Sequence, residues 1–489
     1  MKHDLDPEGT RLPIRIDETS NGEFFPLSLT PRQQRANALA HEAADENSRR
    51  LGLGRRAFLT SSAGAAATLA ACNSANPDAG GRYALPAEAG LDEAAADSVL
   101  TGDEFIFDVQ THCVDPSGAW AVGKDGQIWQ AALSQAFGQA QKCEAGQYDC
   151  YSAQTLAKEV YLDSDTDVAV VSALWGSQKS NPTPTHYAAE AREIIEAIGG
   201  ANSNGRARCL IHGGLLPNDP GHLESMEEKA KVHKVDAWKM YPQWGPDGKG
   251  FFLDQSDYAD RAFEEARRLG VTTIAVHKGV PLYGLEYAYS DPRDMGRAAV
   301  QNPDLTFLVY HSGFEPGQVT EGAYRPESPA GIDRLIKAHQ DVGLKPNEGN
   351  LYAELGSTWR YFMGRPDEAA HVMGKLLKYF GEDRIMWGTD SIWYGSPQDQ
   401  IQAFRAFEIS EEYQEKFGYP ALTAQAKRRI FGLNGAEVYG LDVEKLAGRK
   451  LDNVREAHRA ENNPSFATYG PKTRRDFITM WREHEGRPG

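Results

Sequence analysis

The chain has 489 residues, of which 40% are hydrophobic and 10% aromatic, so it can bury a large core and a disordered chain is excluded. Its 52 Lys and Arg residues against 69 Asp and Glu residues give a net charge of −17. This excess of acid argues against nucleic acid or an anionic membrane as the main partner. The length allows two or three average domains, or one barrel with insertions.

The first 72 residues read as an extension that ends in an export signal. The twin arginine Arg55-Arg56 precedes Phe58-Leu59 and a weakly apolar run of small residues, Ser61 to Ala71. That run is too short and too rich in alanine for a membrane span. It resembles a twin-arginine (Tat) signal and predicts a periplasmic protein. The alternative is a chance basic pair before an alanine-rich helix.

The cysteines fit an exported protein. The sequence Leu69-Ala70-Ala71-Cys72 resembles a lipobox, which leaves open whether the protein is a lipoprotein anchored through Cys72. In an oxidising compartment Cys143 and Cys150 could form a disulfide. Cys113 and Cys209 lie at or in apolar runs, where buried, unreactive thiols are expected.

Residues 73–102 are expected to form a linker, and residues 103–442 alternate strand-like and helix-like stretches. The strand candidates are continuous apolar runs, as expected for parallel strands covered on both faces. They are Glu104–Val109, Asp167–Leu174, Arg208–Gly213, Val235–Tyr241, Val271–His277, Leu305–His311, Asn350–Leu355 and Arg384–Gly388.

Amphipathic helical stretches lie between these runs. They are Tyr187–Ile198, His222–Val232, Tyr258–Leu269, Asp294–Gln301, Ile332–Ala338, Pro366–Phe380 and Gln398–Phe407. Eight strands with intervening helices predict an α/β fold, a (β/α)8 TIM barrel rather than an open doubly wound sheet. Long insertions, 113–166 after the first strand and 314–349 after the sixth, should cover the catalytic face. Residues 443–489 form a C-terminal extension that wraps the barrel or reaches a partner, and a homo-oligomer is left open.

Four of the predicted strands end in side chains that bind metal ions. His112 follows the first strand, His277 and His311 end the fifth and sixth, and Asp390 follows the eighth. The carboxyl ends of barrel strands meet at one mouth, so these groups should converge. Imidazole and carboxylate together suit one divalent transition ion, zinc or manganese foremost. A single strand-end histidine is more often structural, but this combination is harder to explain that way.

The arrangement resembles the amidohydrolase superfamily, specifically the amidohydrolase-related (type 2) branch with the aminocarboxymuconate semialdehyde and γ-resorcylate decarboxylases. The branch has Asp-x-His-x-His at strand one, histidines at strands five and six, and an aspartate at strand eight. The segment Met386-Trp387-Gly388-Thr389-Asp390 and the helix 429–441 fit the same pattern. The resemblance implies a mononuclear site with metal ligands His112, His277, Asp390 and Gln110, and with Asp390 and His311 as catalytic groups.

Gln110 is the one clear departure, because the branch has histidine there. An amide oxygen binds hard cations but is a weak zinc ligand beside imidazole. The sequence therefore predicts a weaker site, and a metal-free descendant is an alternative.

Further candidates are expected to contact the substrate. Lys239 on the fourth strand is interpreted as a partner of a substrate carboxylate or of an acidic side chain. Glu315 and Glu354 could orient His311 or be solvated loop carboxylates. Trp393 could form part of an aromatic wall for a planar substrate or pack in the core.

The sequence predicts a metal-dependent hydrolase that acts on an ester, amide or lactone bond of a small substrate, with an aromatic substrate as one alternative. Asp390 would transfer the proton of an attacking water, and His311 would stabilise the oxyanion. A non-oxidative decarboxylase is the alternative within the same family. A non-catalytic periplasmic binding or scaffold protein is the alternative from another class.

Overall fold

The computed structural model describes residues 11–137, 148–199, 208–246, 248–282, 285–446, 449–475 and 477–478. Cys150 is in a disulfide, and its predicted partner Cys143 lies outside the described residues. The cysteines Cys72, Cys113 and Cys209 are free and buried.

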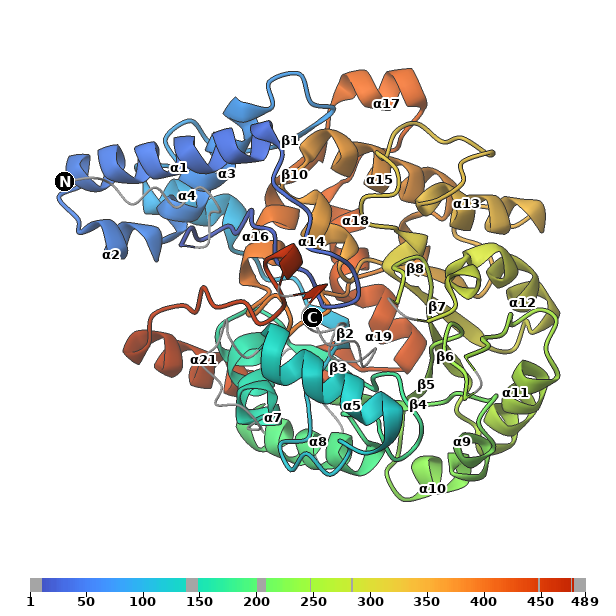
Figure 1. Cartoon of the computed structure of the whole chain (residues 1–489). Coiled ribbons are helices and arrows are strands. Elements are labelled where there is room, and N and C mark those ends of the chain that lie inside the picture. Colours follow the sequence, from blue (N-terminus) through green and yellow to red (C-terminus); the bar gives the residue numbers. More distant parts are fainter. Residues whose placement is uncertain are drawn as a thin grey trace.

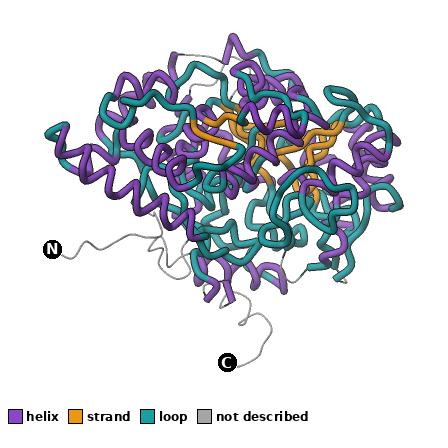
Figure 2. The backbone as a smooth tube through the Cα atoms, turned by 90° about the horizontal axis from the view of Figure 1, so that it is seen from above, coloured by secondary structure: helices purple, strands orange, loops and turns teal. Residues whose placement is uncertain are grey.

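Eight parallel strands form a barrel in simple sequence order. They are β2 (Phe107–Thr111), β3 (Val168–Ser172), β4 (Cys209–Gly214), β5 (Ala237–Met240), β6 (Thr273–His277), β7 (Thr306–Tyr310), β8 (Leu351–Glu354) and β9 (Ile385–Met386). Between β9 and β2 the barrel is closed by a parallel bridge, Thr111 to Ser391, and by a 2.9 Å hydrogen bond from Asp390 N to Gln110 O. Figure 2 shows these strands in the centre of the molecule with helices outside them. The predicted barrel is confirmed, with each strand inside or next to its predicted range.

Helices cover the outside of the barrel (Figure 1). They are α8 (Thr185–Gly199), α9 (Pro220–Glu224), α10 (Met226–Lys231), α11 (Asp257–Leu269), α12 (Met295–Gln301), α13 (Ile332–Asp341), α14 (Thr358–Phe362), α15 (Pro366–Tyr379) and α16 (Gln398–Ala406). The stretch predicted as one helix over His222–Val232 is two short helices that meet at Ser225. The other predicted helices occur close to their expected bounds.

Alternating strand residues fill the barrel interior. Phe107 and Val109 from β2 pack with Val168 and Val170 from β3 and with inward residues of the other strands. This alternation follows from the two-residue period of a strand. The helix α19 (Asn434–Tyr439) contributes Ala436 and Tyr439 to the same cluster.

Further short elements belong to the insertions and to the stretches after the barrel strands. The first insertion holds α5 (Gly123–Ala131), α7 (Ala153–Leu156), the π-helical turns η1 (Ala132–Phe137) and η3 (Ala157–Leu162), and the 3-10 turn η2 (Asp149–Tyr151). The others are η4 (Tyr287–Ser290), η5 (Pro292–Asp294), η6 (His311–Gly313), η7 (Glu382–Arg384), η8 (Arg429–Leu433), α17 (Glu411–Phe417) and α18 (Ala424–Arg428).

The N-terminal residues form a helical layer beside the barrel. It contains α1 (Pro31–Arg50), α2 (Arg55–Leu59), α3 (Ser62–Ala75) and α4 (Glu93–Leu100), which gather on one side of the molecule in Figure 1. The stretch expected as a linker contains α4 and the strand β1 (Gly81–Tyr83), which pairs with β10 (Phe407–Ile409) in an antiparallel ribbon. The alanine-rich run of the expected signal is α3, and its Cys72 is fully buried.

The C-terminal extension returns to the barrel. It contains α20 (Val443–Leu446) and α21 (Arg449–Glu461). Arg455 on α21 donates hydrogen bonds to the carbonyl oxygens of Tyr161 (3.0 Å) and Thr166 (2.8 Å), which fixes this helix against the first insertion. None of the described helices combines the length and apolar character that crossing a membrane requires.

Candidate metal centre at the barrel mouth

The side chains predicted at the strand ends do come together. Asp390 Oδ1 lies 3.1 Å from His112 Nε2 and accepts a 3.0 Å hydrogen bond from Gln110 Nε2. His277 Nδ1 lies 3.3 Å from His311 Nε2. All five side chains are at most 2% exposed. The mouth of the barrel therefore holds a buried cluster of three imidazoles, one carboxylate and one amide.

Asp390 is held as a hydrogen-bond acceptor on both of its oxygens. Its Oδ2 accepts bonds from Ser357 Oγ (2.6 Å) and Asn21 Nδ2 (2.7 Å), in addition to the two contacts of Oδ1. Burial by itself would raise the pKa of Asp390. The hydrogen bond and charge of His112, the charge of His311 and the Ser357 hydroxyl outweigh burial and lower this pKa to about 2. Asp390 is thus an ionised carboxylate at neutral pH.

Each of the three histidines is anchored through one ring nitrogen to a backbone carbonyl. His112 Nδ1 faces Ser172 O at 2.8 Å, His277 Nε2 faces Val280 O at 2.7 Å, and His311 Nδ1 faces Gly356 O at 2.8 Å. A carbonyl can only accept, so these nitrogens carry the proton in the neutral ring. The other nitrogen of His277 and of His311 then directs a lone pair into the cluster, whereas His112 Nε2 lies 3.1 Å from Asp390 Oδ1 and donates to it when protonated. This is the orientation that hydrogen bonds to the outer nitrogen impose on metal-binding histidines.

Burial keeps two of these rings neutral. Burial and the neighbouring His311 hold the pKa of His277 well below its usual range. Burial also lowers the pKa of His311 to about 4, although the charge of Asp390 opposes this. At neutral pH two unprotonated nitrogens consequently face each other across 3.3 Å. Such a pair is unfavourable alone and becomes favourable with a cation beside both nitrogens.

The cluster therefore suits a divalent transition ion. The ligand atoms of His277, His311 and the Glu23 carboxylate all lie within 4.8 Å of one another. Gln110 Oε1 is buried without a hydrogen-bond partner among the described residues, but Gln110 Nε2 is the atom that faces Asp390, so this oxygen would reach an ion only after the amide turns. Imidazoles with carboxylate and amide oxygens make a mixed nitrogen and oxygen donor set that zinc and manganese accept.

Lys239 lies inside the barrel below this cluster and is fully buried. Its Nζ has no hydrogen-bond partner among the described residues, and it lies 3.9 Å and 4.2 Å from the ring centroids of Tyr241 and Tyr310. Burial lowers the pKa of Lys239 to about 7, against the charges of Glu23, Asp390 and Glu354. A buried ammonium over two aromatic faces and without a fixed anion can receive an anionic group.

The other predicted substrate residues have structural partners. Glu354 accepts hydrogen bonds from the backbone N–H groups of His311 (2.9 Å) and Gly356, so it orients His311 through the main chain. Glu315 does not contact His311 and instead binds Arg334 and Tyr287. The ring of Trp393 stacks on His112, with centroids 6.0 Å apart, so Trp393 supports a site residue.

Asn21, Glu23 and Ser357 belong to the site but were not expected from the sequence. The first 72 residues were interpreted only as an extension that ends in an export signal. Two signals were present, namely the alternation of Leu12, Ile14 and Ile16, which are buried in the structure, and the turn-forming dipeptide Asn21-Gly22. Neither signal indicates which distant strands this segment contacts.

The fold and this cluster together define a parallel barrel with a candidate metal site at its mouth. Residues 206–441 match the family model described as Amidohydrolase. The match begins just before β4 and ends just after α19, so it contains His277, His311 and Asp390. This matched stretch, just under half of the chain, is similar to the amidohydrolase family.

Solved structures show a distant likeness. A 2,6-dihydroxybenzoate decarboxylase from Rhizobium is 13% identical, with 69% of this chain and 99% of that chain covered and a TM-score of 0.40. A 5-carboxyvanillate decarboxylase from Novosphingobium aromaticivorans, complexed with manganese and 4-hydroxy-3-methoxy-5-nitrobenzoic acid, is 15% identical, with 69% and 96% covered and a TM-score of 0.41. A 4-oxalomesaconate hydratase from Rhodopseudomonas palustris is 15% identical, with 73% and 100% covered and a TM-score of 0.40. No curated protein matches the chain. At these TM-scores the likeness assigns no substrate to this chain.

Proposed function

We propose that the protein is a metal-dependent hydrolase that cleaves an ester, amide or lactone bond of a small planar substrate. The observation that carries this proposal is the environment of Asp390. Its carboxylate faces Gln110, His112, Asn21 and Ser357, next to imidazoles that direct lone pairs into one cluster. Hydrolysis requires a group that accepts a proton from water, and Asp390 is held in its accepting form.

His112, His277 and Asp390 would hold the ion, and Gln110 Oε1 would add a weaker contact only if its amide turned, because Gln110 Nε2 faces Asp390. The ion, when bound, supplies Lewis acidity to a carbonyl and lowers the pKa of water. Asp390 accepts the proton of the attacking water and delivers it to the leaving group. His311 carries its proton on Nδ1, against Gly356 O, so its Nε2 either joins the ligands of the ion or, when it is not bound to the ion, accepts a second proton. Stabilisation of an oxyanion by His311 would first require that second proton.

The surroundings favour an anionic, planar substrate. The Lys239 ammonium, which lies over the ring faces of Tyr241 and Tyr310, can bind a carboxylate. A second candidate function, non-oxidative decarboxylation, follows from the same lysine. Lys239 would bind the departing carboxylate, and His311 or Asp390 would protonate the ring carbon.

A substrate panel separates the two candidates. Esters, lactones, amides and hydroxybenzoates would be tested with zinc, with manganese and without metal. We expect turnover of a carboxylated ester, amide or lactone that depends on added metal. Release of carbon dioxide from a hydroxybenzoate without hydrolysis would select the second candidate. No turnover by folded, metal-free protein would select a binding or scaffold function.

Export by the twin-arginine route remains part of the proposal. Support comes from the sequence around Arg55 and Arg56, of which Arg56 is exposed at the start of α2. Lipidation at Cys72 would require α3 to leave its packing, because this thiol is fully buried.

A further inference from the structure

The segment 11–29 runs from the helical layer to the barrel mouth. Leu12, Ile14 and Ile16 on this segment are 0–2% exposed. The Asn37 side chain on α1 donates a 2.9 Å hydrogen bond to Ile16 O. The backbone N–H of Ser20 donates a 3.0 Å bond to Pro471 O in the C-terminal extension. The segment is therefore packed between two other parts of the chain.

Two buried ion pairs fasten the same segment to the barrel. Arg15 binds both carboxylate oxygens of Asp399, each at 2.9 Å, and also donates to Ser396 O and Ala467 O. Asp17 pairs with Arg360, and both side chains are at most 5% exposed. Removing one partner of a buried pair leaves an uncompensated charge, which is strongly destabilising. The segment is thus built to stay in place.

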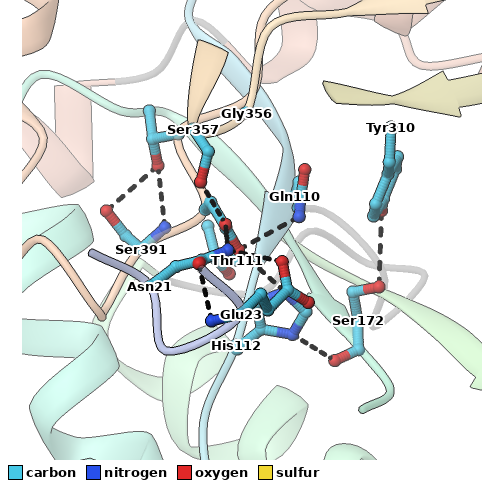
Figure 3. A network of polar contacts seen from close by, with 12 residues as sticks. Asn21, Glu23, Gln110, Thr111, His112, Ser172, Tyr310, Gly356, Ser357 and Ser391 are labelled. Atoms are coloured by element: carbon cyan, nitrogen blue, oxygen red, sulfur yellow. Dashed lines mark hydrogen bonds and ion pairs between the residues drawn. The ribbon is translucent and has the colours of Figure 1, made fainter. Parts of the chain in front are cut away.

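A tight turn at Gly22 in segment 11–29 directs the side chains of Asn21 and Glu23 into the cluster. Gly22 adopts φ +87°, a conformation that glycine adopts easily. Its N–H donates to Ser20 Oγ (2.9 Å), and the N–H of Glu23 donates to Asn21 Oδ1 (3.0 Å). Figure 3 shows Asn21 and Glu23, which belong to this separate segment, beside His112.

The Glu23 carboxylate lies beside the two facing imidazoles. Its oxygens are 3.7 Å from His277 Nδ1 and 3.9 Å from His311 Nε2. These distances are too long for hydrogen bonds. Ligand atoms about 2.1 Å from a tetrahedral ion are roughly 3.4 Å from each other, so the spacing is close to that of ligands around one ion. Asn21 Nδ2 donates to both Glu23 and Asp390, which holds the two carboxylates near each other.

Gln110 leaves one ligand position of the metal site unfilled. Its Nε2 donates a hydrogen bond to Asp390, so the amide turns an N–H group towards that carboxylate. An N–H group cannot bind a metal ion. We propose that segment 11–29 is a permanent part of the catalytic unit, and that the Glu23 carboxylate is the metal ligand that compensates for glutamine at position 110. This inference rests on the proposed metal-dependent function.

The proposal has a consequence for export. Cleavage after Ala71, before Cys72, would remove Asn21 and Glu23 from the mature chain. An exported enzyme must therefore retain its N-terminal residues, at least from Leu12 onward.

The test is metal affinity of the full-length protein, measured by titrating metal-free protein with zinc against a competing chelator. Glu23→Gln should weaken zinc binding by about 10-fold or more, the sensitivity expected of groups that bind or orient at a metal site. Glu18→Gln is the matched control, since Glu18 on the same segment accepts a hydrogen bond from Leu29 N and a glutamine amide oxygen can do the same. The zinc affinity of the Glu18→Gln variant should stay within about twofold of the wild-type value. Glu23→Asp keeps the charge but withdraws the oxygens and should also weaken binding, which provides a second variant should Glu23→Gln fail to fold.

The outcomes separate this inference from the proposed function. Wild-type protein that binds no metal would overturn both. Wild-type affinity in Glu23→Gln would overturn only the role of Glu23, and faster turnover with unchanged affinity would identify the segment as an inhibitory cover instead. A mature exported chain that begins after Ala71 and still binds one equivalent of metal would also overturn the inference.

Discussion

Asn21 Nδ2 donates a 2.7 Å hydrogen bond to Asp390 Oδ2, across 369 positions of the sequence. Asp390 follows the last barrel strand, whereas Asn21 belongs to a segment that precedes the first helix. This contact makes the N-terminal segment and the barrel mouth one structural unit. Metal binding and turnover at the site should therefore depend on both the N-terminal segment and the barrel mouth.

Replacing Asp390 by Asn should abolish turnover. The amide places an NH2 group where the carboxylate faces four polar side chains, and it cannot accept a proton from water. We expect kcat/KM to fall by about 10³-fold, within the usual range for an acid–base residue. The matched control is Asp383→Asn, because Asp383 precedes the same strand and pairs with Arg429. Normal activity in Asp390→Asn would remove this residue from the mechanism.

Replacing Gln110 by His should rebuild the ligand pattern of the family. We expect zinc affinity to rise by about 10-fold, because imidazole is a better zinc ligand than an amide. The same change should restore metal binding to the Glu23→Gln variant if the two positions compensate for each other. Chelator competition measures both effects. Unchanged metal content with lower turnover would mean that Gln110 contacts the substrate instead.

Replacing Lys239 by Met should weaken the binding of anionic substrates. Met keeps the length of the side chain and its packing but removes the ammonium that lies between Tyr241 and Tyr310. We expect KM for a carboxylated substrate to rise by about 10-fold or more, as when a charged hydrogen-bond partner is lost. An uncharged analogue of the same ester should show little change. Equal effects on both substrates would indicate a purely structural lysine.

Replacing Arg55 and Arg56 by Lys should stop export. Residues 1–80 fused to a reporter that works only after folded export would give signal with the native arginines and none with the lysines. Export that continues in the double variant would exclude the twin-arginine route. A Cys72→Ala change made separately should release the protein from membranes only if this cysteine carries a lipid.

The barrel could be predicted because its signals are local. Each strand is a continuous apolar run, and His277 and His311 directly follow such runs, so strand order alone brings them to one mouth. The role of Glu23 depends on a contact between a short turn and strands more than 250 residues away, which no local pattern encodes. The antiparallel pair of β1 with β10 was missed for the same reason. The partners of Glu315 were missed because Arg334 lies on the following helix, α13, and its direction depends on packing.

Metal content tests the central claim most directly. Protein purified without chelator should contain close to one equivalent of a divalent transition ion by elemental analysis, and His277→Ala should lose most of it. His186→Ala, which changes an exposed histidine, should retain it. Active protein that contains no metal and keeps its activity in the presence of a chelator would contradict the account.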